Sequence, residues 1–213
     1  MGMPGQARQS DAVFRPLVAF DFDGTLTSRD SFTAFLAWRA GTRDYAAGLV
    51  ALAPQGLAYL GHRDRGRLKA AVVRRFLAGA QARQIEVEAQ RFATERARSI
   101  LRPDAVRAWR RWQGQGARLV IVTASPEIVV APFARGLGAD QLIGTRLALG
   151  ADGCIAGGLD GPNCRGPEKA RRLREAFGDG VSLDAAYGDT DGDREMLALA
   201  EEQGMKVFNG RSG

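Results

Sequence analysis

Two aspartates, Asp21 and Asp23, lie two residues apart at the end of a short apolar run. Because alternate residues of a strand share a face, both carboxylates are expected to point the same way, with Phe22 on the opposite face. Gly24 would let the chain turn closely past a ligand, and Thr25 adds a hydroxyl. Paired carboxylates suit Mg²⁺, which prefers oxygen ligands, and they can divide the work of a nucleophile and a general acid and base. Taken alone, the Asp-x-Asp pattern would favour a surface turn, but here the pair follows a predicted buried strand and is matched by a second acidic cluster.

A second acidic cluster lies at residues 188–193, after another short apolar run. Its aspartates, Asp189, Asp191 and Asp193, repel one another unless a cation or solvent compensates. A calcium loop of the helix-loop-helix type would need Glu at its twelfth position, and Ala200 stands there instead. The cluster therefore indicates a site for another cation, or an exposed acidic turn if it is taken alone.

Two further segments suit a phosphate group. Thr123 and Ala124 follow an apolar run, and Pro126 suits the first position of a helix with Ser125 as its N-cap. The free backbone amides at such a helix start can bind an anion. Lys169 lies at another predicted helix start. Taken alone, Ser125 would be a plain cap and Lys169 a surface lysine.

The elements that must position these residues alternate between strands and helices. Apolar runs predict strands at residues 17–22, 118–123, 185–187 and 206–208, and amphipathic patterns predict helices at residues 104–113, 167–177 and 193–203. This alternation favours an α/β fold, a Rossmann-like parallel sheet with helices on both faces. Such sheets bind ligands at the carboxyl ends of their strands, where the polar residues described above begin. Residues 144–166 instead predict a hairpin at the sheet edge, with its turn at an Asp-Gly pair.

Residues 29–100 interrupt the alternation. They contain four helical patterns, at residues 31–39, 45–60, 67–77 and 82–99. We expect them to form an all-helical cap over the site, inserted into a Rossmann-like catalytic core of residues 15–28 and 101–213. Residues 1–14 are expected to form a flexible tail.

In chain order, the acidic pair, the threonine, the lysine and the acidic cluster resemble the four motifs of the haloacid dehalogenase superfamily of phosphatases. The string DFDGTLT is highly specific for that family, and the resemblance covers residues 17–208. The helical insertion after the first motif resembles the cap of phosphoserine phosphatases. The stretches DSFTAFL, TASPE and GPNCRGPEK resemble a branch that includes phosphatidylglycerophosphate phosphatases.

The resemblance implies a Mg²⁺-dependent phosphomonoesterase that forms an aspartyl-phosphate. Asp21 would be the nucleophile, and Asp23 would protonate the leaving oxygen and later activate water. Thr123 and Lys169 would hold the phosphoryl group. The metal site would consist of Asp21, the backbone carbonyl of Asp23, Asp189, and Asp193 in support. These roles suit phosphoryl transfer, which depends on in-line positioning and neutralised oxygens.

The wider set of expected phosphate contacts consists of Phe22, Gly24, Thr25, Thr123, Ala124 and Lys169. Phosphoserine phosphatases carry a Glu after the first motif that meets the amino group of the substrate. Asp30 stands at the corresponding spacing here and is one methylene shorter. Asp30 is therefore a candidate substrate contact, but serine specificity does not carry over.

Charge is distributed unevenly along the chain, whose net charge is +6. Residues 61–83 contain one acid, Asp64, and seven basic residues: Arg63, Arg65, Arg67, Lys69, Arg74, Arg75 and Arg83. This run is either a solvated helix face or a field that attracts an anionic substrate or an anionic membrane. No zinc-finger spacing or RNA-binding aromatic motif accompanies it, so no nucleic-acid partner is expected.

Residues 45–62, directly before the basic run, contain no Asp, Glu, Lys or Arg. As one helix they would be roughly 27 Å long at about 1.5 Å per residue, close to a hydrocarbon thickness of about 30 Å. Pro54, Gly48 and Gly56 make this a poor spanning helix. Packing within the cap is favoured, peripheral contact of an interfacial helix with an anionic membrane comes next, and a spanning helix is the least favoured interpretation that stays open.

The composition, 45% hydrophobic and 25% charged, is that of a globular protein. Cys154 and Cys164 are too few for a zinc site or a disulfide framework. Residues 1–10 have no apolar signal segment. We therefore expect reduced thiols in a cytoplasmic protein, with peripheral contact at the inner membrane surface left open.

The expected activity is hydrolysis of a small-molecule or lipid phosphate, with phosphatidylglycerophosphate, phosphoserine or another metabolite as the substrate. Two alternatives belong to other classes of protein. One is a signalling receiver that keeps its phospho-aspartate, although receivers place their acidic pair and acceptor on different strands. The other is a membrane-binding protein with a vestigial site. The sequence predicts no oligomeric state.

Overall fold

A single six-stranded sheet organises the computed structural model, which describes residues 15–210; the predicted tail, residues 1–14, lies outside this range. The strand order is β4-β3-β2-β1-β5-β6. The strands are β1 (Leu17–Phe20), β2 (Arg118–Pro126), β3 (Gln141–Leu149), β4 (Ile155–Asp160), β5 (Leu183–Gly188) and β6 (Ala200–Met205). All neighbours pair in parallel except β3 and β4, which form an antiparallel hairpin at one edge. The predicted α/β Rossmann-like fold and the edge hairpin are both confirmed.

The register of the central strands brings their carboxyl ends to one place. Phe20 of β1 pairs with Ile121 of β2 on one side and with Tyr187 of β5 on the other. The residues that follow these three strands therefore meet at the same edge of the sheet, as expected for parallel strands.

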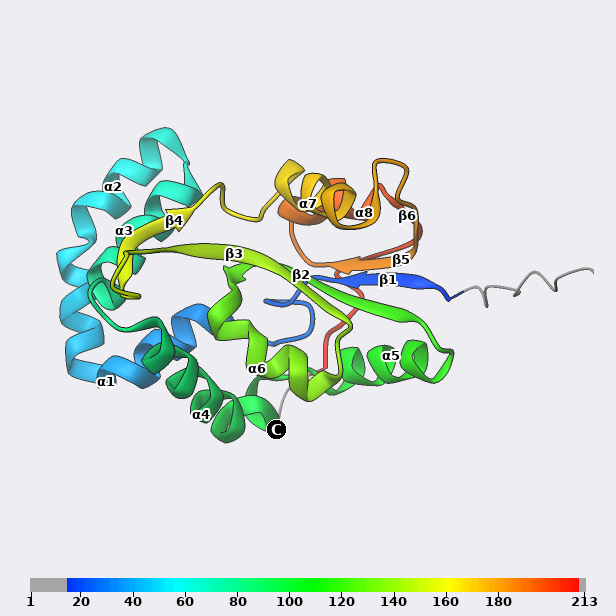
Figure 1. Ribbon diagram of the computed structural model, residues 1–213, viewed down its shortest axis with the longest axis horizontal. Helices are drawn as coiled ribbons and strands as arrows, with labels where there is room; N and C mark the ends of the chain where they lie inside the picture. Colours follow the sequence, from blue (N-terminus) through cyan, green and yellow to red (C-terminus); the bar gives the residue numbers. More distant parts are fainter. Residues whose placement is uncertain (1–14, 211–213) are drawn as a thin grey trace, which may run out of the picture.

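Helices cover both faces of the sheet (Figure 1). α5 (Pro103–Gly114) and α6 (Glu127–Leu137) lie on one face, and α7 (Pro167–Phe177) and the single-turn α8 (Arg194–Leu197) lie on the other. Side chains of β1 alternate between the two faces and so belong to two hydrophobic clusters. Val18 and Phe20 belong to the cluster on the face covered by α5 and α6, and Ala19 belongs to the cluster on the face covered by α7 and α8.

Four helices connect β1 to α5. They are α1 (Ser31–Ala51), α2 (Ala53–His62), α3 (Arg65–Leu77) and α4 (Ala82–Ile100). The chain enters and leaves this cap at neighbouring positions, because the backbone N–H of Ser28 donates to Ile100 O at 2.7 Å and that of Arg102 donates to Leu26 O at 2.8 Å. Across residues 15–210, the helices all lack the combination of length and apolar character that crossing a bilayer requires.

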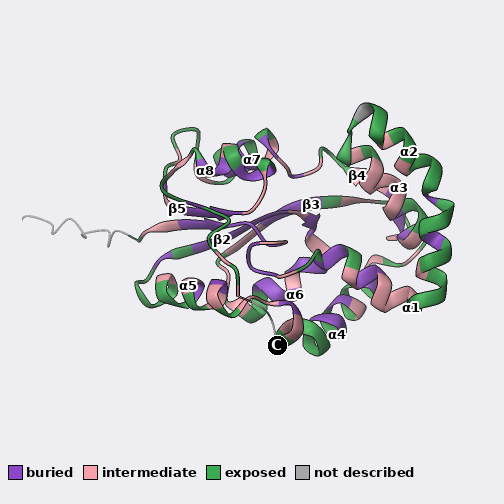
Figure 2. Ribbon diagram, turned by 180° about the vertical axis from the view of Figure 1, so that it is seen from behind, coloured by how far each residue is buried: buried purple, intermediate pink, exposed green. Residues whose placement is uncertain are grey.

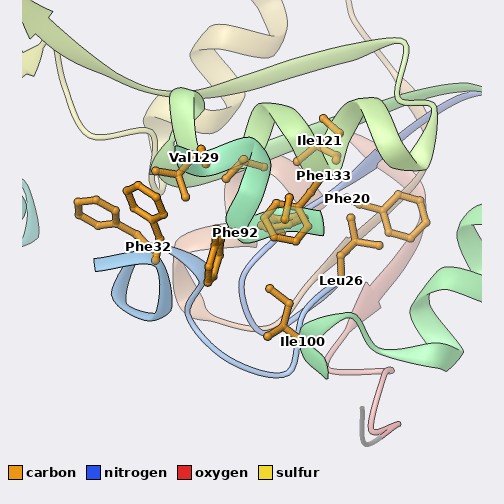
Figure 3. Close-up of a cluster of buried hydrophobic side chains, with 14 of the residues drawn as sticks. Phe20, Leu26, Phe32, Phe92, Ile100, Ile121, Val129 and Phe133 are labelled. Carbon is orange, nitrogen blue, oxygen red and sulfur yellow. The ribbon is translucent and has the colours of Figure 1, made fainter. Parts of the chain in front are cut away.

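The larger hydrophobic cluster ties the cap to the sheet. Figure 3 shows Phe32 and Phe92 of the cap in the same cluster as Ile121 of β2 and Phe133 of α6. The rings of Phe92 and Phe133 meet edge to face, with centroids 5.9 Å apart. The cap is therefore held over the carboxyl ends of the strands by buried aromatic contacts.

Three element predictions were wrong. The last described strand is Ala200–Met205 rather than residues 206–208, and the helix predicted at residues 193–203 ends after one turn at Leu197. β6 is a polar edge strand held by backbone pairing to β5, so its sequence has no apolar run that would reveal it. The helix predicted at residues 45–60 is divided at Leu52, because Pro54 favours the first turn of a new helix, α2.

Candidate active site

Lys169 lies at the centre of the site and is 1% exposed. It is in the first turn of α7, which begins at Pro167. Its ammonium donates to Oδ1 of Asp21 at 2.5 Å, to Oδ1 of Asp193 at 2.7 Å and to the carbonyl of Val122 at 2.6 Å. All three protons of the side chain are therefore used, and one lysine joins the ends of β1 and β2 to the acidic cluster.

Burial and charge shift the pKa values of this group strongly. Burial raises the pKa of Asp21 to about 7; the neighbouring Asp193 adds to the shift and the ammonium of Lys169 opposes it. Burial alone would lower the pKa of Lys169, but Asp21 and Asp193 together hold it above its usual range. Burial would raise the pKa of Asp193, and the contact with Lys169 reverses that effect.

Three carboxylates could hold a metal ion. Oxygens of Asp21, Asp189 and Asp193 all lie within 4.8 Å of one another. Both oxygens of Asp193 are already engaged, Oδ1 by Lys169 and Oδ2 by the backbone N–H groups of Asp189 and Thr190. Asp193 therefore suits a supporting position. A cluster of hard oxygen donors with an excess of negative charge fits Mg²⁺.

Asp23 lies beside this cluster and is held by two donors. Its Oδ1 accepts from the backbone N–H of Ser31 at 2.7 Å, and its Oδ2 accepts from the hydroxyl of Ser125. Burial raises the pKa of Asp23, the nearby Asp30 raises it further, and the hydrogen bond from Ser125 lowers it.

The predicted N-cap at Ser125 was wrong. β2 continues to Pro126, and α6 begins at Glu127 without a side-chain cap. The Ser125 hydroxyl is directed instead to Asp23, and the Ser125 backbone N–H donates to Oγ1 of Thr123 at 3.0 Å. The end of β2 therefore directs the Ser125 hydroxyl toward the acidic pair, and Thr123 holds the Ser125 backbone in place.

A cavity of about 460 Å³ joins the predicted site residues of the core and the cap. From the core it is lined by Asp21, Asp23, Thr123, Ala124, Lys169, Asp189 and Asp193, and from the cap by Asp30, Phe32, Thr33, Tyr59, Arg65, Leu68, Lys69 and Val72. Asp30 also caps α1, since it accepts from the backbone N–H of Thr33 at 2.6 Å.

Three residues of the expected phosphate-binding set lie outside this lining. The side chain of Phe22 packs in the core against Phe133, with ring centroids 5.4 Å apart. Gly24 lies against the carboxylate of Asp189. Thr25 is buried, and its hydroxyl has no hydrogen-bond partner among the described residues. Any contact of Phe22 or Gly24 with phosphate would come from the backbone.

Lys69 is a charged cavity residue that the sequence analysis did not name as a site residue. Its ammonium donates to the carbonyl of Ala124, which also accepts from Thr145. Burial lowers the pKa of Lys69 to about 8, although Asp30 and Asp23 oppose the shift. In the sequence, Lys69 was only one cation of the basic run. Its four-residue spacing from Arg65 places both residues on one face of α3, and this spacing is the sequence feature that could have indicated their shared position at the cavity.

A search against protein-family models matches residues 18–198 to the haloacid dehalogenase-like hydrolase family. The chain belongs to this family. Among its relatives, protein CicA of Caulobacter vibrioides is 62% identical over 92% of this chain and 87% of that protein. A phosphoserine phosphatase of Halobacterium salinarum is 31% identical over 86% of this chain and 82% of its own length.

A solved structure of a phospho-aspartyl intermediate analogue of phosphoserine phosphatase has the same fold as this haloacid dehalogenase-like hydrolase. The TM-score is 0.59 at 21% identity, over 89% of this chain and 85% of the other. At that identity the likeness establishes the fold.

Proposed function

We propose that this protein is a Mg²⁺-dependent phosphomonoesterase that forms a covalent aspartyl-phosphate on Asp21. The observation that carries the proposal is the placement of Lys169, which bonds both Asp21 and Asp193 at the floor of a cavity that Thr123 and Asp23 also line. Two further findings support the same proposal: the chain belongs to the haloacid dehalogenase-like hydrolase family, and its sequence is 31% identical to that of a phosphoserine phosphatase.

In the first step, a carboxylate oxygen of Asp21 attacks phosphorus while the bond from phosphorus to the leaving oxygen breaks. Lys169 holds Oδ1 of Asp21, which leaves Oδ2 free to attack. Asp23 gives its proton to the leaving oxygen. Burial and the nearby Asp30 raise the pKa of Asp23, so that it can hold this proton.

In the second step, Asp23 takes a proton from a water molecule that attacks the phosphorus of the aspartyl-phosphate. The bond from phosphorus to Asp21 breaks, which releases inorganic phosphate and restores both carboxyl groups. Thr123 and Lys169 both line the cavity. The Thr123 hydroxyl can donate to a phosphoryl oxygen there, and Lys169, whose three protons are already bonded, can stabilise the phosphoryl group through its positive charge.

Asp21, Asp189 and the backbone carbonyl of Asp23 would hold Mg²⁺, with Asp193 fixing the loop behind them. When bound, the ion supplies positive charge that neutralises the phosphoryl oxygens during transfer. The fit rests on the three carboxylates within 4.8 Å of one another and on the single buried lysine that opposes their charge.

The test is Mg²⁺-dependent release of p-nitrophenol from p-nitrophenyl phosphate. Asp21→Asn should lower the rate by at least about 10³-fold, because an amide cannot act as the nucleophile. Asp179→Asn removes an exposed carboxylate outside the cavity lining and should leave the rate unchanged. Full activity of Asp21→Asn would contradict the mechanism. A stable phosphoprotein without turnover would indicate a signalling receiver instead.

For the substrate we propose an anionic phosphomonoester, with phosphatidylglycerophosphate and phosphoserine as the first candidates. The basic cap residues Arg65 and Lys69 in the cavity lining support an anionic leaving group. A screen of the Mg²⁺-loaded protein against phosphoserine, sugar phosphates, nucleotides and phosphatidylglycerophosphate would separate these candidates by their kcat/KM values.

A further inference from the structure

The outer edge of the cap presents an apolar surface to solvent. Leu49 and Val50 lie in the last turn of α1. Leu57 and Leu60 lie three residues apart on α2, so these two share a face. The exposed fractions of the four residues are 47%, 76%, 69% and 70%, in that order. We call these four side chains the cap patch. Figure 2 shows the exposed faces of α1 and α2 along this edge of the molecule.

Packing within the cap does not account for the cap patch. The inward side of the same segment already has its contacts: the ring of Tyr45 packs against that of Phe76 of α3 with centroids 5.5 Å apart, and Gly48 lies against the same Phe76 ring. The segment is therefore apolar on both sides, which is typical of a helix with partners on both sides.

α4 shows how an ordinary surface helix of this cap is built. It buries Ile85, Ala89 and Phe92 on one side. Its solvent side carries charged residues, namely Arg83, Glu86, Arg91, Glu95, Arg96 and Arg98. Residues 45–62 contain no Asp, Glu, Lys or Arg, so their solvent side lacks the charges that keep such a face in water.

Basic residues continue the cap patch at its end. Arg63 caps α2 and is exposed, and the exposed Arg65 and Arg67 follow in the first turn of α3. Arg67 pairs with Asp64 at 3.2 Å. Asp64 is the one acid among residues 63–67, which contain three arginines, so this stretch keeps a net positive charge. An apolar helix face that ends in exposed arginines is complementary to a bilayer surface with anionic headgroups.

We propose that the cap patch docks on the surface of an anionic lipid bilayer. Leu49, Val50, Leu57 and Leu60 enter the boundary between headgroups and acyl chains, and the arginines after α2 contact the headgroups. α2 has 10 residues, so it is about 15 Å long and lies in the plane of the interface.

Docking would bring the cavity close to the lipid surface. Tyr59 of α2 lines the cavity, while its neighbours Leu57 and Leu60 belong to the cap patch. Arg65 also lines the cavity, and it lies only two residues after Arg63, one of the arginines proposed to contact the headgroups. Docking itself does not rest on the proposed phosphatase function, and Asp21→Asn should bind the same vesicles as the wild type.

The experiment is vesicle co-sedimentation of the full chain. One vesicle contains phosphatidylcholine alone, and the other contains equal parts of phosphatidylcholine and phosphatidylglycerol. The wild type should sediment with the anionic vesicles only, and less so as the salt concentration rises. Leu57→Gln/Leu60→Gln should weaken this binding at least about tenfold, because the burial of two leucine side chains in the bilayer no longer contributes to the free energy of binding.

Two control variants separate docking from general surface effects. Val87→Gln/Leu149→Gln removes two exposed apolar side chains outside the cap patch, and it should bind like the wild type. Arg63→Gln/Arg67→Gln should weaken binding to the anionic vesicles, whereas Arg107→Gln/Arg110→Gln on α5 should weaken it much less. Circular dichroism of each variant checks that the fold is kept.

Three results would overturn the proposal: no binding to either vesicle, equal binding to both, or wild-type binding by Leu57→Gln/Leu60→Gln. A fourth would reassign the surface. If sedimentation velocity shows a dimer that these leucine substitutions dissociate, and no vesicle binding occurs, the cap patch joins two copies of the chain. Phosphate release from p-nitrophenyl phosphate, measured on the same samples, reports the proposed catalytic function independently.

Discussion

Oδ2 of Asp189 lies 2.0 Å from the position that a Cβ on Gly24 would take. The acidic cluster after β5 can therefore approach the first motif only because residue 24 has no side chain. Gly24 also has a φ of +85°, a conformation that L side chains rarely adopt. The glycine of the first motif thus serves the meeting of two carboxylate groups, in addition to the turn.

Gly24→Ala should displace Asp189 and weaken Mg²⁺ binding. We expect the Mg²⁺ concentration for half-maximal phosphate release to rise at least about tenfold, the range seen when groups that orient a metal ligand are disturbed. Gly116→Ala is the matched control, since Gly116 has a φ of +75° and open space around its Cβ position. Both variants should lose about 1 kcal/mol of stability from the backbone conformation. Equal Mg²⁺ requirements in the two variants would contradict this account.

Mg²⁺ affinity should depend on pH through Asp21. Burial raises the pKa of Asp21 to about 7, with help from Asp193 and against Lys169. A metal binds the ionised carboxylate, so protons compete with Mg²⁺ below that pKa. In calorimetric titrations, the apparent Kd should rise as pH falls from about 8 to about 6, by up to about tenfold per unit at the lower end. A Kd that stays constant over this range would exclude Asp21 as a titrating ligand.

The pH–rate profile should respond in opposite directions to two substitutions around Asp23. The hydrogen bond from Ser125 lowers the pKa of Asp23, and the charge of Asp30 raises it. Ser125→Ala should therefore move the profile to higher pH, and Asp30→Asn should move it to lower pH. Both limbs should move, because in the proposed mechanism Asp23 acts first as the acid and then as the base.

Asn at residue 30 can still cap α1, as Asp30 does through Thr33. A change in the profile of Asp30→Asn would therefore report charge and not loss of the helix start. Shifts in the same direction for Ser125→Ala and Asp30→Asn would show that Asp23 does not control the profile.

The sequence predicted the polar residues that follow the buried strands better than it predicted the side chains that contact them in the folded site. Asp21, Thr123 and Lys169 were found because apolar runs and a helix start place them at the sheet edge. Ser125 was misassigned as a cap, because local helix rules cannot reveal that β2 continues to Pro126, which pairs with Thr145 of β3 beyond a register shift. Tertiary pairing decided between two local structures that the sequence allowed equally.

Lys69 was hidden for a related reason. Its partner, the carbonyl of Ala124, lies 55 residues away, and only the packing of the cap over the core brings the two together. β6 shows the same limit at the other edge of the sheet, where Glu201, Glu202 and Gln203 form a strand without apolar alternation. Contacts of this kind come from topology, which periodicity alone does not report.

Lys69→Met should stabilise the fold while impairing function. Burial lowers the pKa of Lys69 from 10.5 to about 8, so the folded protein binds this proton less tightly than the unfolded chain does. Below pH 8 the ionised lysine therefore costs stability, and this cost disappears as pH rises from about 8 to about 10.5. Urea unfolding should show a higher free energy of unfolding for Lys69→Met at neutral pH, with the advantage shrinking over that interval.

The carbonyl of Ala124 keeps its bond from Thr145 at 2.7 Å, so removal of the lysine leaves it paired. Lys206→Met is the control, because Lys206 is exposed and its replacement should leave the free energy of unfolding nearly unchanged. The KM for an anionic phosphomonoester should rise in Lys69→Met and not in Lys206→Met, because Lys69 lines the cavity and Lys206 does not. A destabilised Lys69→Met with wild-type KM would show that this lysine serves the fold and not the site.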